Sequence, residues 1–231
     1  MSPTFQWLIR WGCLAVMSLA VLLHIVGMSV AHWLKIVARP EGYPGILRFL
    51  EQEGVDTGPN STVTGAVTHA EVNVGLWRWC VEVQILGSKY DACRTPGLGD
   101  FPGWWRASQA LAVIGLLMGM LSGMCGGMEV YYSRRGVRFS GLAVLCSISC
   151  FVTALALGLS NGLYASRYLG KVTTVLDIWQ AASSFMYPPS LDWAFGFGAA
   201  AATLMGGTGI ILLAFITRTY PAYHRTENVV V

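Results

Sequence analysis

The chain contains four apolar windows that lack charged side chains and are long enough to cross a lipid bilayer. They cover residues 11–31, 107–128, 139–164 and 193–216, and none of them contains Asp, Glu, Lys or Arg. About 20 consecutive apolar residues match the ~30 Å hydrocarbon core of a membrane. Only 12% of the 231 residues are charged, whereas 54% are hydrophobic. The sequence therefore predicts an all-α membrane bundle of four transmembrane helices.

The positions of Lys and Arg predict how these helices are oriented. The short segment 131–138 contains three Arg and no acid, and further Arg residues lie before the first window and after the fourth. Of the 12 Asp and Glu residues, ten fall in the other two connecting segments, 33–106 and 165–192. Basic residues accumulate on the cytosolic side of a membrane. We therefore expect both termini in the cytosol and the two acidic segments outside the cell.

The whole chain, 1–231, is interpreted as one domain. The expected transmembrane helices are about 11–32, 107–130, 139–164 and 193–216, followed by a cytosolic tail at 217–231. A cleaved signal peptide is the alternative for the first window, because Arg10 precedes it. The length of about 20 residues and the lack of a clear cleavage site favour a retained helix.

The six cysteines fall into two groups in this topology. Cys80 and Cys93 lie in the outer segment 33–106, where an oxidising compartment allows them to pair. Such a bridge would close a short loop and contribute about 3 kcal/mol through chain entropy. The remaining cysteines lie in the apolar windows and are expected to behave as small apolar residues, with palmitoylation as the alternative for Cys125. These are Cys13, Cys125, Cys146 and Cys150.

Small residues recur at every fourth position of the second window. Gly119, Gly123 and Gly127 are the clearest set. Glycines at this spacing let helices approach one another in lipid, where apolar burial gives no driving force. We expect this set to pack inside the bundle, and a self-association face is the alternative.

The outer segment 33–106 has the pattern of a small sheet with one short helix. Residues 44–53 have apolar side chains at helical spacing, which predicts an amphipathic helix. Alternation typical of strands follows between 62 and 85, and a return strand is expected at 89–95. Residues 32–37 are a further candidate strand. A sheet of this size has little core of its own, so the cysteine bridge is structurally necessary.

Asn60 begins the triplet Asn60-Ser61-Thr62 in the same polar segment. This is a sequon for N-glycosylation, which occurs on surface loops of proteins that pass through the secretory route. We therefore expect Asn60 to carry a glycan.

A set of signature residues lies between the first and second apolar windows. Trp33, the run Gly75-Leu76-Trp77, and Cys80 and Cys93 follow the order W…GLW-x-x-C…C. In this pattern the chain resembles the claudin superfamily, which includes claudins, peripheral-myelin and epithelial membrane proteins, the lens fibre tetraspan and calcium-channel gamma subunits. Arg106 is similar to the arginine at the start of the second helix in claudins. The resemblance covers nearly the whole chain.

This resemblance implies a claudin-like, left-handed four-helix bundle that carries a small extracellular β-sheet. Four strands are expected from 33–106 and one from 165–192. The resemblance also implies that Trp33, Trp77 and the disulfide anchor the sheet to the bundle, and an indole ring suits a membrane interface because it is apolar with one N–H donor. Two features differ from typical claudins. The stretch between the two tryptophans is longer and contains the sequon, and the paired cysteines after the second helix are missing.

The residues give little support to catalysis or transport. The four His residues are scattered, and no Ser/His/Asp, Cys/His or paired-carboxylate arrangement has motif spacing. His24 lies inside an apolar window, and a hydrogen-bonded structural role is expected because no window contains an acidic partner. The net charge of +3 is spread over the chain and does not indicate nucleic-acid binding. We therefore expect a non-enzymatic protein without metal or cofactor.

Two functions remain as hypotheses. The resemblance and the apolar residues of the outer segments favour a multi-pass plasma-membrane protein of cell–cell junctions. It would act in adhesion or in a paracellular barrier by contacting other membrane proteins, or itself in cis or in trans. The alternative is an auxiliary, gamma-like subunit of an ion channel or receptor, which the long glycosylated segment favours. Under either hypothesis Val229 and Val231 can add to a PDZ scaffold as the end of a strand.

Overall fold

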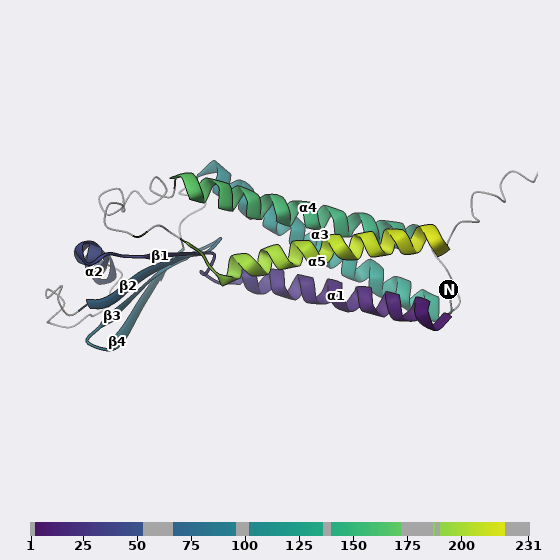
Figure 1. Cartoon of the computed structure of the whole chain (residues 1–231), viewed down its shortest axis with the longest axis horizontal. Helices are drawn as coiled ribbons and strands as arrows, with labels where there is room; N and C mark the ends of the chain where they lie inside the picture. Colours follow the sequence, from purple (N-terminus) through teal and green to yellow (C-terminus); the bar gives the residue numbers. More distant parts are fainter. Residues whose placement is uncertain are drawn as a thin grey trace, which may run out of the picture. The chain divides into compact units, whose positions relative to one another are not determined.

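The computed structural model describes residues 3–52, 67–95, 102–135, 140–171, 187 and 190–219. In this part of the chain four helices are long and apolar enough to cross a membrane (Figure 1). They are α1 (Pro3–Ser29), α3 (Gly103–Arg134), α4 (Ser140–Lys171) and α5 (Trp193–Thr219). The prediction of four membrane-length helices is confirmed.

The helices do not end where the apolar windows end. α1 begins at Pro3 rather than at 11 and stops at Ser29 rather than at 32, and α3 extends beyond 107–130 in both directions. The windows mark only the stretch without charges. A helix continues as long as its backbone groups and its charged side chains find partners. Arg10 illustrates this, because it lies inside α1 and not in front of it.

By its internal contacts the chain divides into two compact units, and each is described by itself. The helix unit comprises Met1–Ile25, Leu111–Leu159 and Gly198–Val231. The sheet unit comprises Val26–Ala110 and Ser160–Phe197. The helix unit thus contains most of the four long helices, whereas the sheet unit contains the strands that the structure describes.

Glycines bring the helices of the helix unit close together. A methyl group at Gly126 would lie 2.6 Å from Met17 Cε, and one at Gly119 would lie 3.2 Å from neighbouring side chains. Gly123 and Gly127 instead face open space. The expectation that the whole set packs inside the bundle was therefore wrong for these two. Residues four apart drift by about 40° around a helix of 3.6 residues per turn, so the set does not stay on one face.

A buried ion pair joins α1 to α3 in the helix unit. Arg10 Nε lies 3.3 Å from Glu129 Oε1, and the two side chains are only 6% and 7% exposed. The Arg10 guanidinium also donates to Ser133 and lies over the ring of Phe215 in α5, 5.3 Å from its centroid. Removing one partner of a buried pair costs about 3–5 kcal/mol. The pair therefore fixes how these helices are rotated against one another.

The sheet unit contains a five-stranded antiparallel sheet in the order β4-β3-β2-β1-β5 (Figure 1). Its strands are β1 (Leu34–Val37), β2 (Val67–Val74), β3 (Trp79–Ile85), β4 (Ser88–Arg94) and β5 (Ser190–Leu191). The first four come from the segment between α1 and α3, and the fifth comes from the segment between α4 and α5. This division of strands is the one expected.

One face of this sheet is apolar and forms the core of the sheet unit. The register places Ile36, Val72 and Val81 side by side, and all three are buried. The predicted amphipathic helix is α2 (Tyr43–Gln52), which follows the short helix η1 (Pro40–Gly42) and packs against β2. Its buried side chains are Tyr43, Ile46, Leu47 and Leu50.

The first residue of the turn between β2 and β3, Gly75, lies where no side chain fits. Gly75 N donates to Arg78 O at 2.8 Å, which closes the turn. A methyl group at Gly75 would lie 2.5 Å from Val30 O and 2.7 Å from Ala31 Cα. Both are backbone atoms, which can move aside only if the chain itself shifts. The glycine of the GLW motif is therefore required by the close approach of two backbone segments.

We expect Gly75→Ala to destabilise the protein, because the added methyl group overlaps backbone atoms and such overpacking costs about 1–3 kcal/mol or more. Gly12→Ala is the matched control. A methyl group at Gly12 would have no neighbouring atom within 4 Å, and alanine forms helices better than glycine does. Thermal unfolding of the purified proteins in detergent measures the difference. Equal midpoints for the two variants would contradict this account of the turn.

Candidate functional site

The candidate site for contacts with other molecules comprises the polar second face of the sheet and the tip of the β3–β4 hairpin. Residues directly opposite one another in an antiparallel sheet share a face. One such row contains Lys35, Asn73, Cys80 and Cys93, and the next contains Glu71, Glu82 and Asp91. We call these two rows the polar face. Three carboxylates on neighbouring strands repel one another, so the face needs compensating partners.

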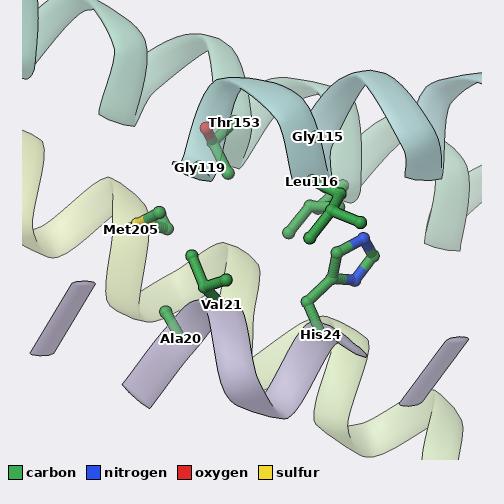
Figure 2. A pocket seen from close by; sticks show the side chains of 9 residues that line it. Ala20, Val21, His24, Gly115, Leu116, Gly119, Thr153 and Met205 are labelled. Carbon is green, nitrogen blue, oxygen red and sulfur yellow. The ribbon is translucent and has the colours of Figure 1, made fainter. Parts of the chain in front are cut away.

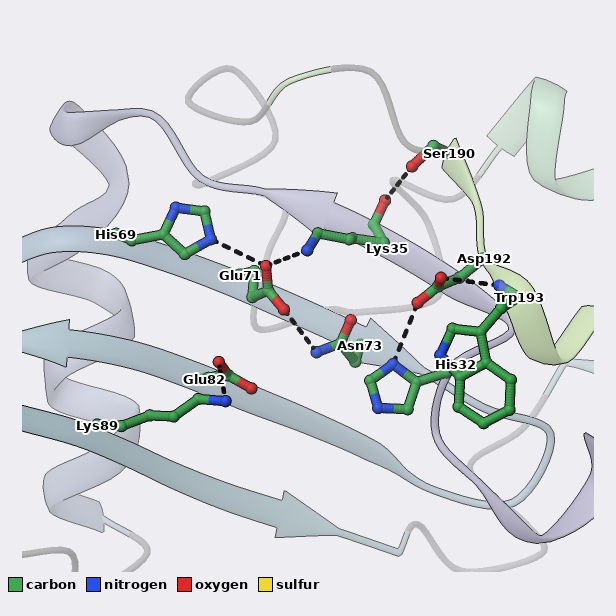
Figure 3. Close-up of polar contacts among 10 residues, drawn as sticks. All are labelled: His32, Lys35, His69, Glu71, Asn73, Glu82, Lys89, Ser190, Asp192 and Trp193. Carbon is green, nitrogen blue, oxygen red and sulfur yellow. Dashed lines mark hydrogen bonds and ion pairs between the residues drawn. The ribbon is translucent and has the colours of Figure 1, made fainter. Parts of the chain in front are cut away.

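Glu71 has the most complete set of partners on the polar face. Its Oε2 accepts from Lys35 Nζ at 2.5 Å and from His69 Nε2 at 2.9 Å, and its Oε1 accepts from Asn73 Nδ2 at 3.0 Å (Figure 3). Burial alone would raise the pKa of Glu71. The hydrogen bonds from Lys35, His69 and Asn73 and the charge of Lys35 outweigh burial and lower this pKa to about 2. Glu71 is therefore an anion that ties β1 to β2.

The carboxylate of Glu82 is paired across the β3–β4 hairpin. Its Oε1 lies 2.5 Å from Lys89 Nζ (Figure 3). The hydrogen bond to Glu82 raises the pKa of Lys89 above its ordinary value, and the nearby charge of Glu82 adds to this. Because Lys89 is well exposed, the pair contributes little to stability. The acid row is thus balanced by lysines on either side.

A second polar contact connects the residues before β1 with the start of α5. His32 Nδ1 lies 3.1 Å from Asp192 Oδ2, and its ring stacks on that of Trp193 with centroids 5.3 Å apart (Figure 3). Asp192 Oδ1 accepts a hydrogen bond from Trp193 N at 2.8 Å. A carboxylate at this position favours the beginning of a helix. The contact therefore places the first residue of α5 beside β1.

The predicted disulfide between Cys80 and Cys93 is present. The two residues are opposite each other in β3 and β4, with Cα atoms 4.0 Å apart. The bridge lines a groove of about 360 Å³ on the polar face. The other lining residues include Ala31, His32, Asn73, Arg78, Glu82 and Asp91. Cross-linking the hairpin stabilises the sheet by constraining the unfolded chain, by about 3 kcal/mol.

Trp33 is at the centre of an aromatic cluster in the sheet unit. Its side chain is 1% exposed, and its Nε1 donates to Gly27 O at 2.6 Å. The ring meets Tyr164 of α4 edge-on at 5.0 Å between centroids and Phe195 of α5 at 6.0 Å. Trp105 of α3 contacts the same tyrosine at 5.7 Å. One indole ring therefore joins β1 to the adjoining ends of α1, α4 and α5.

The remaining signature residues have different environments. Leu76 is fully buried, and its carbonyl oxygen accepts from Trp105 Nε1 and Gln109 Nε2, both at 2.8 Å. Trp77 is only half-buried, and Arg106 is exposed on α3. Within the GLW motif it is thus the leucine that is packed most deeply.

The tip of the β3–β4 hairpin presents an apolar side chain to solvent. Leu86 has a positive φ of 50°, Gly87 has a φ of 86°, and the leucine is 72% exposed. Two successive positive φ values are typical of a type I′ turn, for which Asn-Gly or Asp-Gly is preferred. Leucine is uncommon at a positive φ, and such strain concentrates at functional positions. Leu86 is therefore a candidate contact residue.

His24 lies in the helix unit and hydrogen-bonds to the backbone as expected. Its Nε2 donates to Ala112 O at 2.9 Å, and Figure 2 shows the imidazole extending from α1 towards α3. The adjoining cavity has a volume of about 10 Å³ and is lined by residues such as Gly119, Thr153 and Met205. A cavity of this size is about that of one water molecule. The contact of His24 is therefore one between helices.

Several predicted features fall outside the described residues. They are the sequon at Asn60 and the C-terminal residues Val229 and Val231. In the part of the chain that the structure describes, no group of three or more His, Cys, Asp and Glu side chains is placed to hold a metal ion.

Sequence reasoning did not single out Glu71 or Tyr164. Glu71 had a signal, because it lies between His69 and Asn73 at alternate positions of a strand, where polar side chains share one face. For Tyr164 the sequence contains no signal other than its place at the end of an apolar window. Its contacts depend on how α4 is rotated, which the sequence does not state.

Comparison with family models and with curated proteins identified no relative of this chain. No family model matches the chain, and no curated protein matches it. The functional argument therefore depends on the residues and geometry described above.

We expect Glu71→Gln to destabilise the protein at neutral pH, because the variant loses the charge that Lys35 and His69 bind. The pKa of Glu71 is lowered from 4.5 to about 2 on folding, so its contribution is complete above pH 4.5 and is lost as the pH falls towards 2. The difference in stability between wild type and variant should therefore shrink across this window. Urea unfolding at several pH values measures it, and a constant difference would contradict the assignment.

Proposed function

We propose that this chain is a claudin-type tetraspan protein of the plasma membrane that acts at cell–cell junctions, in adhesion or in a paracellular barrier. In this proposal both termini are cytosolic, the helices form a left-handed bundle and residues 1–231 form one domain. The segments that supply the sheet face the outside, where Asn60 is glycosylated. The sheet contacts other membrane proteins, or a second copy of the chain.

The origin of the strands is the observation that carries this proposal. Four strands come from the segment between α1 and α3, and a fifth from the segment between α4 and α5. The sheet contains the Cys80–Cys93 disulfide and packs its Trp33 anchor against the ends of helices. The resemblance to claudins implies this combination of strand origin, disulfide and Trp33 contacts. The combination supports the proposal more strongly than any one of these features does.

The exposed apolar residues of the sheet unit support a role in protein contacts. Leu86 is 72% exposed, and Tyr187 is 51% exposed while its backbone N–H donates to Val37 O at 2.9 Å. Arg39 lies over the tyrosine ring at 5.2 Å. Aromatic and arginine side chains on a rigid support are enriched at interfaces. By contrast, acids and lysines of the polar face pair with each other, which favours contacts through apolar groups over attraction by net charge.

The alternative is an auxiliary, gamma-like subunit of a channel or receptor. The length of the stretch between Trp33 and Trp77 and the sequon within it favour this function. It uses the same sheet but a different partner, namely the outer part of a channel in the same membrane. The localisation experiment below separates the two.

We expect Leu86→Asn to gain a glycan, because it creates the sequon Asn-Gly-Ser at an exposed hairpin tip. The experiment uses an Asn60→Gln background to remove the natural sequon. A mobility shift that a glycosidase abolishes would place the sheet outside. Adding Ser88→Ala destroys the new sequon and is the matched control. A folded, disulfide-bonded variant without a glycan would contradict the proposed orientation.

We expect the tagged protein to be enriched where two expressing epithelial cells meet, and Leu86→Asp to reduce this enrichment. Asp-Gly suits the type I′ turn, so the variant keeps the hairpin but loses the exposed apolar side chain. Imaging of mixed cultures of expressing and non-expressing cells measures the effect, with surface labelling to check delivery.

Glu41→Gln, an exposed change in η1, is the control and should leave the enrichment unchanged. A diffuse surface distribution of the unmodified protein, together with a co-purified channel, would favour the auxiliary-subunit function. Undiminished enrichment of the Leu86 variant would exclude the hairpin tip as the contact.

A further inference from the structure

Three sulfur atoms from two helices meet in the interior of the helix unit. Met17 Sδ of α1 lies 3.8 Å from Cys146 Sγ and 3.6 Å from Cys150 Sγ, both of α4. Cys146 Sγ also donates to the backbone oxygen of Ser122 in α3, 3.4 Å away. Ser122 of α3 adds a hydroxyl group 2.8 Å from Cys150 Sγ and 3.1 Å from Met17 Sδ. We call these four side chains the sulfur cluster.

The cluster is shielded from solvent. Met17 is 1% exposed, and Cys146, Cys150 and Ser122 are fully buried. Cys146 and Cys150 are four residues apart, so they lie on one face of α4 and point the same way. A pair of cysteines on one helix therefore faces a methionine on another.

The separations suit a metal ion bound by three sulfur atoms. If each metal–sulfur bond is about 2.3 Å, three ligands arranged at the corners of a triangle are about 4.0 Å apart. The two separations from Met17 Sδ, 3.8 Å to Cys146 Sγ and 3.6 Å to Cys150 Sγ, are slightly shorter than this. Small rotations of the side chains would open the triangle without moving the helices.

The ligand types select the metal. Thiolate and thioether sulfurs are soft ligands that favour Cu(I), whereas Zn²⁺ sites usually have four ligands drawn from Cys, His and carboxylates. Among the described residues, no third His, Cys, Asp or Glu completes such a group. A methionine as the third ligand is therefore unsuited to Zn²⁺ but suited to Cu(I).

We propose that Met17, Cys146 and Cys150 bind one Cu(I) ion inside the helix unit. Each bond from copper to a cysteine replaces an S–H bond, so two protons leave, and the thioether binds as a neutral ligand. The occupied site then has one net negative charge, to which the Ser122 hydroxyl donates a hydrogen bond. The copper remains Cu(I), and no electron is transferred.

α1 carries one further cysteine in the helix unit. Cys13 lies one helical turn before Met17 and lines an open apolar groove of about 430 Å³ between α1 and α5. The groove lining includes Gly12, Thr203, Gly207 and Ile211.

The test is an anaerobic titration of the purified full chain in detergent with Cu(I), in competition with a chromogenic Cu(I) chelator. We expect one copper per chain, and X-ray absorption should show three sulfur neighbours at about 2.3 Å. Met17→Leu conserves side-chain volume and should weaken binding at least about tenfold without unfolding the protein. Cys146→Ala with Cys150→Ala should abolish binding.

Met120→Leu is the matched control, because this methionine of α3 is 47% exposed and lies outside the buried core that contains the sulfur cluster, so the affinity should stay unchanged. Thermal unfolding without copper shows whether each variant is folded. The proposal fails if the unmodified chain takes up no copper, if the absorption spectrum shows nitrogen or oxygen ligands, or if folded Met17→Leu binds as tightly as the unmodified chain. None of these outcomes depends on the proposed junctional function.

Discussion

The carbonyl oxygen of Leu76 is the acceptor on which the arrangement of the sheet unit depends. It accepts hydrogen bonds from Trp105 Nε1 and Gln109 Nε2, so two side chains of α3 hold the turn between β2 and β3. All three residues are buried, and a buried polar group left without a partner costs about 1–3 kcal/mol. The turn reaches this position because Gly75 has no side chain to keep it away from the backbone after α1. The disulfide then holds β4 to a β3 strand whose start is already fixed.

Strand alternation gives the sheet one apolar and one polar face, and the charges of the polar face exclude the sheet from the hydrocarbon core of a membrane. A row containing Glu71, Glu82 and Asp91 cannot enter hydrocarbon, where charges are not solvated. Among the strands that the structure describes, β4 lies at one edge of the sheet, and it carries Lys89, Asp91 and Arg94. Charged edge strands resist pairing with other strands. The apolar hairpin tip is therefore a better contact point than the edge.

The sequence predicts those features that depend on composition and local period. Windows without charges identify the four long helices, helical spacing identifies α2, and alternation identifies the strands. The pairing of Cys80 with Cys93 follows because both lie in one polar segment. The contact of Arg10 with Glu129 could not be predicted, because it depends on how each helix is rotated about its axis. A window that is apolar on all sides of the helix does not indicate which side faces the other helices. The same reason explains why Cys146 and Cys150 were expected only as small apolar residues.

In a bundle surrounded by lipid, a few specific contacts must select the rotation that apolar burial cannot select. The Arg10–Glu129 pair is one such contact, and the hydrogen bond from Ser147 Oγ to Gly209 O at 3.1 Å is another. Gly126 is a third, since a methyl group there would lie 2.6 Å from Met17 Cε. The space that Gly126 leaves is occupied by the end of the side chain whose sulfur meets the two cysteines. The packing that brings α1 against α3 and the geometry of the sulfur cluster thus depend on the same missing side chain.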